Sequence, residues 1–250
     1  MRRTAPIAIA ALALALAGCG GDDSSGNAAS TQSLVVSAAS SLTGALTSCS
    51  KQFKRANVRL SFAGSDELAA QIRQGVKPDV YAAANTKLPD QLAHEGLLDT
   101  PVNFATNELV IAVPKDSSIS SINDLAKPGI KLVIGSETVP VGSYTRAVLG
   151  RLPSGENQEI MANVRSNEPD GKGVVGKLTQ GAADAGFVYR TDITGDLKAV
   201  ALPRDLQPVV EYGAAVVKGA EHPNMAKQYL DGLTNGACAD ALRSAGFGSP

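Results

Sequence analysis

Apolar residues in this chain follow two alternating periods, one typical of strands and one typical of helices. Residues 34–38 form a short run with a strand pattern, and from 42 to 53 apolar residues recur with helical spacing. The same order follows twice more, with strands at 58–63 and 79–84 and helices at 65–77 and 86–95. Strands that alternate with helices predict an α/β fold, in which a mostly parallel sheet carries helices on its faces.

A second series of the same kind begins at the apolar run 109–113, which precedes Pro114. We expect further strands at 131–134, 163–165, 185–189 and 209–217, and helices at 122–126, 142–149, 172–180, 223–233 and 238–244. A chain of 250 residues is long enough to give two such α/β units a sizeable core.

The first residues have the pattern of a targeting segment. Arg2 and Arg3 precede an apolar run at 5–17, which is shorter than the roughly 20 residues of a membrane-spanning helix. A positive start followed by a short apolar run is typical of secretory signals. We therefore expect residues 1–18 to be a signal peptide that is removed on export.

The residues around the expected cleavage point carry a second signal. Residues 16–19, LAGC, resemble the bacterial lipobox, in which cleavage leaves Cys19 as a lipidated N-terminus. An ordinary signal peptide beside an incidental cysteine is the alternative. The small polar residues at 19–33 are expected to form a flexible tether. These features predict an extracytoplasmic lipoprotein that is anchored to the cell membrane.

Composition narrows the function further. The formal net charge is −1, so the chain lacks the basic excess of a nucleic-acid-binding protein, and no nucleic-acid partner is expected. Two histidines leave few candidates for a general base and argue against a histidine-rich metal site. Composition thus disfavours nucleic-acid binding and histidine-rich metal chemistry.

The remaining cysteines, Cys49 and Cys238, are an even pair in an exported chain and are expected to form a disulfide. Two buried free thiols are the alternative. A bond between them would return the C-terminal helices to the first unit. The predicted lobes are then 34–112 with 212–250 as lobe I, and 113–211 as lobe II. Two connecting segments would form a hinge, with a ligand bound between the lobes.

Small hydroxyl residues lie where predicted strands turn into helices. Ser41 and Ser65 occupy two such junctions, and Val141 and Gly171 each precede a further predicted helix. A helix start presents free backbone N–H groups in a positive potential, which favours anions without help from lysine or arginine. Ordinary helix capping is the alternative for both serines.

Six short motifs connect these junctions to a known family. They read ASSLT, FAGS, PDV, VPVG, GFVY and EYGA, at residues 39–43, 62–65, 78–80, 139–142, 186–189 and 211–214. In this order the chain resembles the periplasmic molybdate-binding proteins of ABC transporters, from about residue 34 to 247. The resemblance implies the two-lobe, type II solute-binding fold.

The resemblance also implies a set of oxyanion ligands. These are the hydroxyl and backbone N–H groups of Ser41 and Ser65, the backbone N–H groups of Val141 and Gly171, and the Tyr189 hydroxyl. Molybdenum would be bound as its oxyanion through these residues, with no direct metal ligand, no cofactor and no catalytic residue. Relatives often have Val-Arg where this chain has Gly171 and Lys172, and an ordinary core tyrosine is the alternative for Tyr189.

Neutral, convergent donors suit a fully ionised tetrahedral dianion, because a protonated phosphate would present an O–H group that needs an acceptor. The sequence therefore predicts a monomeric receptor that captures molybdate, and also tungstate, for the permease of an ABC importer. Sulfate is a smaller alternative ligand in the same site. Asp66 and Glu168 stay open as carboxylate ligands of the kind that related tungstate binders use.

Two other hypotheses remain open. An organic anion or amino acid would call for an arginine that forks onto a carboxylate, and Arg146 and Arg190 lie close to predicted ligand loops. The glycines of GKGVVG, residues 171–176, spell a dinucleotide-binding pattern with Asp192 about 20 residues on, as in a nucleotide-dependent oxidoreductase. This pattern comes late in the chain and follows a lengthened loop, which disfavours that reading.

Overall fold

The computed structural model describes residues 32–250. The predicted signal peptide, the lipidation site Cys19 and nearly all of the predicted tether lie outside the described residues. The last residue of that tether, Ser33, already belongs to the first strand, β1 (Ser33–Ala39). Within residues 32–250, no helix combines the length and the hydropathy needed to cross a bilayer.

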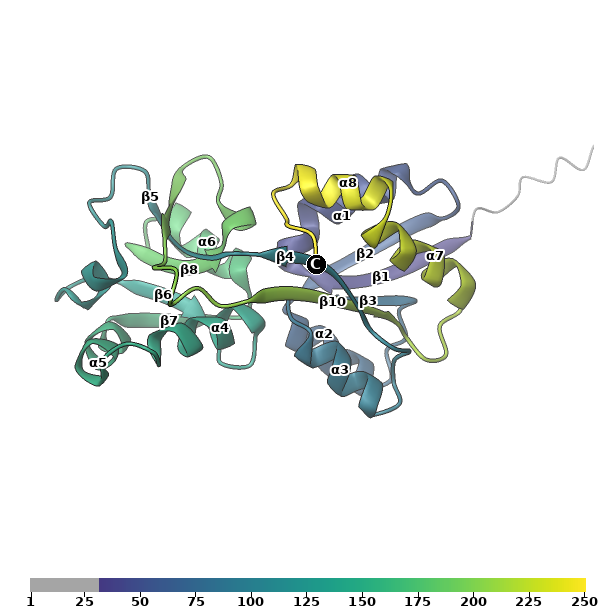
Figure 1. The fold of residues 1–250 in the computed structure, drawn as a ribbon, viewed down its shortest axis with the longest axis horizontal. Coiled ribbons are helices and arrows are strands. Elements are labelled where there is room, and N and C mark those ends of the chain that lie inside the picture. Colours follow the sequence, from purple (N-terminus) through teal and green to yellow (C-terminus); the bar gives the residue numbers. More distant parts are fainter. Residues whose placement is uncertain (1–31) are drawn as a thin grey trace, which may run out of the picture. The chain divides into compact units, whose positions relative to one another are not determined.

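The first sheet has the strand order β2-β1-β3-β10-β4. Its other strands are β2 (Asn57–Ala63), β3 (Val80–Ala83), β4 (Val102–Asn107) and β10 (Val210–Val216). Strand β1 pairs in parallel with β2 and β3, whereas β10 is antiparallel to β3 and β4. The helices of this unit are α1 (Thr43–Gln52), α2 (Ser65–Arg73), α3 (Lys87–His94), α7 (Pro223–Thr234) and α8 (Ala237–Ser244), as Figure 1 shows.

Alternation along the strands divides these helices between two faces. In β3, Val80 and Ala82 join the core that contains residues of α1, α7 and α8, while Tyr81 and Ala83 join the core with residues of α2 and α3. Successive strand residues point to opposite faces of a sheet, so a strand that is buried on both sides reads as continuously apolar. This explains why residues 79–84 carry a strand signal without polar alternation.

The second sheet has the order β7-β6-β8-β5-β9. Its strands are β5 (Leu109–Pro114), β6 (Leu132–Gly135), β7 (Val164–Glu168), β8 (Ala185–Tyr189) and β9 (Leu197–Ala201). The helices are α4 (Pro140–Leu149), α5 (Ser154–Ala162) and α6 (Gly171–Thr179). Three short 3₁₀ turns, η1 (Ser40–Leu42), η2 (Ile122–Ala126) and η3 (Arg190–Asp192), complete the elements named here.

Both sheets are mixed rather than mostly parallel. Strand β5 is antiparallel to β8 and β9, as β10 is to its two neighbours. Each of these two strands enters its sheet directly from the other sheet, without the helical crossover that parallel neighbours require. The chain leaves the first sheet between Asn107 and Leu109 and returns between Ala201 and Val210. The first crossing therefore lies a few residues before the predicted lobe limit at 112, and the lobe limits stay a prediction.

Three elements carry no clear sequence signal. Strands β4 and β9 lie at sheet edges and are partly exposed, so their apolar pattern is weak. Helix α5 buries only Ile160, and the rest of its residues are polar or exposed. The other predicted strands and helices are present, although residues 122–126 form a 3₁₀ turn instead of an α-helix. Buried faces produce the periodicity from which elements can be predicted, and these three have little buried face.

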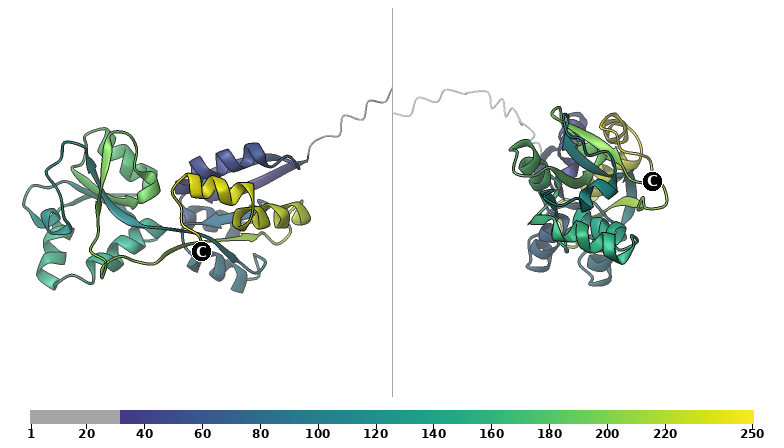
Figure 2. Two further views of the ribbon diagram at one scale, coloured as in Figure 1. Left: turned by 45° about the horizontal axis from the view of Figure 1, so that its top comes forward. Right: turned by 90° about the vertical axis from the view of Figure 1, so that its left-hand side faces the viewer.

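Helices α1 and α8 are joined by a disulfide between Cys49 and Cys238, which are 189 residues apart in sequence. Figure 1 and the left-hand view of Figure 2 show α8 beside α1. The end of the chain is held as well, because Gly248 and Thr106 of β4 exchange backbone hydrogen bonds of 3.0 and 2.9 Å. The first sheet and its helices are thus assembled from both ends of the described chain.

Candidate functional site

The five predicted oxyanion-binding residues line one small cavity. Ser41, Ser65, Val141, Gly171 and Tyr189 surround it, together with neighbours that include Asp170. Ser41 and Ser65 follow β1 and β2 of the first sheet, and the other three belong to α4, α6 and β8 of the second. The cavity is about 10 Å³, close to the size that holds one water and far below the hundreds of Å³ of organic-ligand sites. As the structure stands, this space is too small for an organic ligand.

Ser41 belongs to the 3₁₀ turn η1, so the predicted first helix begins with a tighter turn than expected. Its Oγ lies 3.0 Å from the hydroxyl oxygen of Tyr212 in β10. The residue at the N-cap of η1 is Ala39, and that of α1 is Leu42. Ser41 is therefore not a helix cap, which was the alternative interpretation.

Ser65 is the buried first residue of α2, and Gly64 holds the N-cap position. The Ser65 Oγ accepts the backbone N–H of Ala84 at 3.1 Å, and its carbonyl accepts the Tyr81 hydroxyl at 2.7 Å. This hydroxyl does not cap the helix either. Because its oxygen already accepts one bond, its own hydrogen is free to be donated elsewhere.

Val141 is the second residue of α4, directly after Pro140 at the helix start. The first four N–H groups of a helix have no partner within it, so the Val141 N–H is available to a ligand. The next residue must be glycine. A Cβ on Gly142 would lie 1.9 Å from the Ser136 carbonyl oxygen and 2.4 Å from that of Gly135. Close contact with the end of β6 thus fixes where α4 begins.

Gly171 is the buried first residue of α6, where Asp170 caps the helix by accepting the Gly173 N–H at 2.8 Å. A Cβ on Gly171 would lie 2.8 Å from Oδ2 of Asp192. A carboxylate therefore occupies the space in which a larger residue would place its side chain. This contact accounts for the glycine at this position.

Tyr189 ends β8 with its hydroxyl 3.4 Å from the carbonyl oxygen of Ala84, to which it donates. Its ring makes edge contacts with Tyr212 and Tyr144, at centroid distances of 5.7 and 6.5 Å. Burial raises the pKa of Tyr189 well above its ordinary value. The hydroxyl therefore keeps its proton at any physiological pH and can act as a donor.

Asp192, which the sequence offered only as part of the dinucleotide pattern, lies beside the site. Asp192 accepts the Tyr189 N–H at 3.2 Å and touches the space over Gly171. Loss of hydration raises the pKa of Asp192 to about 7, although the residue is only partly buried. The Asp170 charge adds to this rise, while the bond from the Tyr189 N–H and the Lys172 charge oppose it. Its signal in the sequence, an aspartate three residues after Tyr189, is an ordinary turn pattern and does not predict this role.

The other candidate side chains are engaged away from the cavity. Asp66 accepts the Thr138 hydroxyl at 2.5 Å, and Glu168 accepts that of Ser166 at 2.7 Å. Neither lines the cavity. Within residues 32–250, no group of three histidines, cysteines or acids is placed to hold a metal ion.

The two arginines kept for an organic anion are also engaged. Arg146 donates to the carbonyls of Gly135 and Gly142 at 2.8 and 3.2 Å, which helps to hold the start of α4. Arg190 pairs with Glu108 at 2.5 Å. No arginine lines the cavity.

The dinucleotide pattern does not form the turn that it would need. Gly171, Gly173 and Gly176 all lie within α6, instead of in a loop between a strand and a helix. In dinucleotide-binding folds the first two glycines form that loop, against which the pyrophosphate lies. The glycine spacing is therefore a coincidence of a glycine-rich helix.

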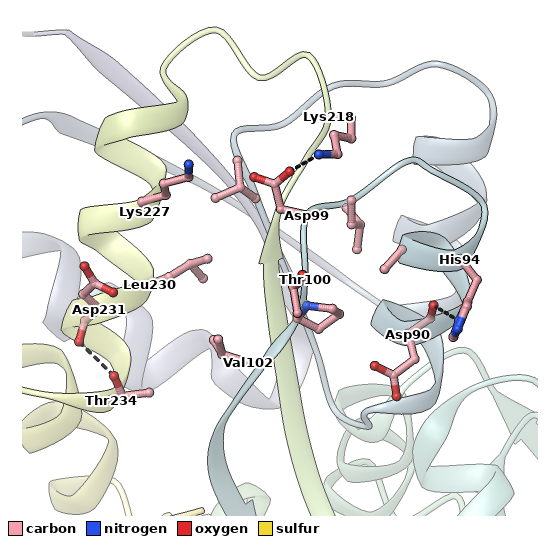
Figure 3. Close-up of a pocket in the computed structure, with 14 residues that line it drawn as sticks. Asp90, His94, Asp99, Thr100, Val102, Lys218, Lys227, Leu230, Asp231 and Thr234 are labelled. Carbon is pink, nitrogen blue, oxygen red and sulfur yellow. Dashed lines mark hydrogen bonds and ion pairs between the residues drawn. The ribbon is translucent and has the colours of Figure 1, made fainter.

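A larger open groove of about 850 Å³ lies elsewhere, on the first sheet and its helices (Figure 3). Its charges are partly paired, as in the contact of Asp99 with Lys218. His94 bonds to the carbonyl of Asp90, and Thr234 to that of Asp231, within the helices that border the groove. None of the five predicted site residues lines it.

Two α/β units joined by two crossings, with a small donor-lined cavity formed by both, define the class of two-lobed ligand receptors. Residues 34–248 match the bacterial extracellular solute-binding proteins, and the chain belongs to that family. It is accordingly a binding protein and not an enzyme.

Named relatives are close in sequence over nearly the whole chain. The molybdate-binding protein ModA of Mycobacterium tuberculosis is 37% identical, with 96% of this chain and 95% of that protein covered. ModA of Escherichia coli is 30% identical, with 86% and 88% covered. These relatives confirm the resemblance that the six motifs indicated.

Solved structures agree in fold. The periplasmic molybdate-binding protein of Azotobacter vinelandii has a TM-score of 0.76 at 21% identity and covers 87% of this chain and 99% of its own. The sulfate-binding protein SubI of Mycobacterium tuberculosis has a TM-score of 0.75 at 16% identity, with 86% of each chain covered. At such identities these matches confirm the predicted α/β fold of periplasmic binding proteins and say nothing about the ligand.

Proposed function

We propose that this protein captures molybdate between its two lobes and delivers it to the permease of an ABC importer. The observation that carries the proposal is the convergence of five donor-bearing residues from both sheets on one cavity of about 10 Å³. The relatives named as molybdate-binding proteins support the choice of ion. Tungstate, a tetrahedral dianion of the same kind, is expected to bind in the same way.

The chemistry of the donors supports a fully ionised oxyanion. Hydrogen bonds to an ionised acceptor are about twice as strong as neutral ones, so neutral hydroxyls and N–H groups suffice. Ser41 and Ser65 would donate through both their hydroxyl and backbone N–H groups. Tyr189 would donate through its hydroxyl, and Val141 and Gly171 through their backbone N–H groups. Tyr189 would exchange its long bond to Ala84 for a charge-assisted bond to the ion.

Sulfate is the second candidate, because the match to a sulfate-binding protein shows that this fold serves a smaller tetrahedral dianion in another chain. The same donors would serve both ions. The distinction rests on cavity size, since an ion that is too small cannot reach donors on opposite walls at once.

The proposal extends to how the protein is held and how it moves. We propose that a lipid on Cys19 anchors the chain outside the membrane, and that residues 34–112 with 212–250 close on residues 113–211 as a monomer binds its ion. Replacement of Cys19 by serine should release the protein from the cell surface. Retention of that variant on the membrane would contradict the anchor.

The deciding experiment is thermal unfolding of the purified protein, lacking residues 1–18, with molybdate, tungstate, sulfate, phosphate and a mixture of amino acids. A ligand at 100 times its Kd should stabilise the protein by about 2.7 kcal/mol. A rise in Tm with molybdate and tungstate alone would support the proposal, whereas an equal rise with sulfate would assign a broader oxyanion site. A response to amino acids alone would overturn it.

A further inference from the structure

A chain of three side chains leads from the crossing between the sheets to the first serine of the site. Asn107, the last residue of β4, donates from Nδ2 to Thr191 Oγ1 at 2.9 Å and to the Tyr212 hydroxyl oxygen at 3.4 Å. The Tyr212 hydroxyl lies 3.0 Å from Ser41 Oγ. Ser41 in turn lines the cavity.

The orientation of the Asn107 amide is fixed by its other end. Its Oδ1 accepts the backbone N–H of Glu108 at 2.9 Å, so Nδ2 must be the atom that faces Tyr212. An amide nitrogen donates and cannot accept. The Tyr212 oxygen therefore accepts from Asn107, and its single hydrogen is left for Ser41.

The Tyr212 hydrogen is thus available to Ser41 Oγ, 3.0 Å away. When Ser41 Oγ accepts it, the Ser41 hydrogen is not needed for that bond and can be donated to an ion in the cavity. We propose that Asn107 and Tyr212 are positioning residues that set the Ser41 hydroxyl as a donor toward the bound oxyanion. This inference rests on the proposed function, because it assumes that Ser41 contacts the ion.

The surroundings of Tyr212 make it suited to this role. It is fully buried, and its ring makes edge contacts with Phe104, Phe247 and Tyr189 at centroid distances of 6.1, 5.3 and 5.7 Å. Because the ring is held on three sides, the Tyr212 hydroxyl oxygen stays beside Ser41. Burial also raises the Tyr212 pKa well above its ordinary value, so the hydrogen that it donates is always present.

The test is a double-mutant cycle with Tyr212→Phe and Ser41→Ala, read out as the Kd for molybdate by calorimetry. Tyr212→Phe keeps the ring and removes the hydroxyl, and it should weaken binding about 5- to 10-fold in the native background. In the Ser41→Ala background it should change the Kd by less than about 2-fold, because the group that it orients is gone. A purely structural role for Tyr212 would give the same loss in both backgrounds.

Tyr229→Phe is the matched control, since Tyr229 is also buried but packs against Phe53 in the unit that contains the disulfide. It should leave the Kd unchanged. If Tyr212→Phe does not fold, Asn107→Ala serves in its place, because it removes the donor at the other end of the chain. The same non-additivity with Ser41→Ala is then expected.

The outcomes separate this inference from the proposed function. If the native protein binds molybdate and Tyr212→Phe binds it equally well, only the positioning role is overturned. If the native protein binds sulfate instead, the molybdate proposal fails and the cycle is run with sulfate. Absence of binding to any tetrahedral oxyanion would overturn both.

Discussion

The first and second sheets place their strands in the same arrangement. In each, the second strand from one edge (β1 or β6) lies between two parallel neighbours, and two antiparallel pairings follow toward the far edge. Their contributions to the cavity differ. The first sheet supplies two serine hydroxyls, while the second supplies two helix starts and one tyrosine. The two sheets therefore share one topology but contribute different groups to the cavity.

The two kinds of donor need different support. A hydroxyl can rotate, so each serine is held by a bond from a neighbour, Ser41 by Tyr212 and Ser65 by the Ala84 N–H. A backbone N–H cannot rotate, and its direction is set by where the helix begins. The start of α4 therefore depends on the close glycine contact at Gly142, whereas the two serine hydroxyls are held by hydrogen bonds.

The largest expected effect on stability comes from the disulfide, which lies in the first unit. Replacing Cys49 and Cys238 together by alanine should lower the free energy of unfolding by about 3–5 kcal/mol, because the loop that the bond closes is long. Urea denaturation of the native and variant proteins measures this. Two thiols that alkylate freely in unfolded, unreduced protein would contradict the bond itself.

The next prediction concerns the helix start in the second unit. Gly142→Ala should lower the free energy of unfolding by about 2–4 kcal/mol, since the new Cβ would overlap backbone atoms of residues 135 and 136. Gly176→Ala in α6 is the matched control, because nothing lies within 4 Å of its Cβ position. That control should be more stable by about 0.5–1 kcal/mol. Equal stability of the two variants would show that α4 can shift without cost.

The serines test the first unit directly. Ser41→Ala and Ser65→Ala should each weaken molybdate binding by about 1–3 kcal/mol, the range for a hydrogen bond to a charged group. Ser65→Ala should in addition lower the free energy of unfolding, because it leaves the Ala84 N–H without its partner. Ser48→Ala, on the exposed side of α1, is the control, and calorimetry is the measurement. Unchanged affinity in both site variants would refute the assignment of the site.

A pH dependence between about pH 4 and 7 is expected from Asp192 in the second unit. The Asp192 pKa rises from near 4 when unfolded to about 7 when folded, so the folded state holds more protons between these values. Stability should therefore fall as the pH rises from about 4 to 7, by about 1–2 kcal/mol after allowance for partial exposure. Asp192→Asn should flatten this part of the curve. Thermal unfolding across pH 4–8 checks it, and an unchanged slope would contradict the assignment to Asp192.

The smallest effect concerns a contact between the units. Lys172 of α6 bonds to the Thr43 hydroxyl and lies 5.6 Å from the Phe62 ring centroid. Because this lysine is exposed, Lys172→Met should weaken ion binding by only about 0.5 kcal/mol, with a faster release rate. Lys177→Met on the same helix is the control. Stopped-flow release kinetics would show a tenfold change if the contact instead holds the closed state.

Ser41, Ser65, Val141 and Gly171 lie at strand-to-helix junctions, which leave a local mark in the sequence. The resemblance to a known family, and not position alone, singles them out as expected ligands, and the structure places them around one cavity. The side chains that contact these residues, Tyr212 and Asp192, could not be predicted in this way. Tyr212 reaches Ser41 across 171 residues of sequence, and Asp192 meets Gly171 only because β8 ends beside the start of α6. Such contacts follow from packing and have no local pattern.

The fold shows the same division. Doubly buried strands such as β3 and β5 were clear, because their whole length is apolar. The mixed pairing was not predicted, since the direction of a strand depends on where the chain comes from and not on its own residues. Strand β9 and helix α5 left weak signals for want of a buried face.

The position of β10 has a consequence for how the protein is made. This strand lies between β3 and β4, and all residues of the second sheet precede it in the chain. A chain that emerges from its N-terminus completes the strands of the second sheet before β3 and β4 receive the neighbour that joins them. Export from the N-terminus thus brings out every strand of the second sheet while the first sheet, two of whose helices follow β10, is still incomplete.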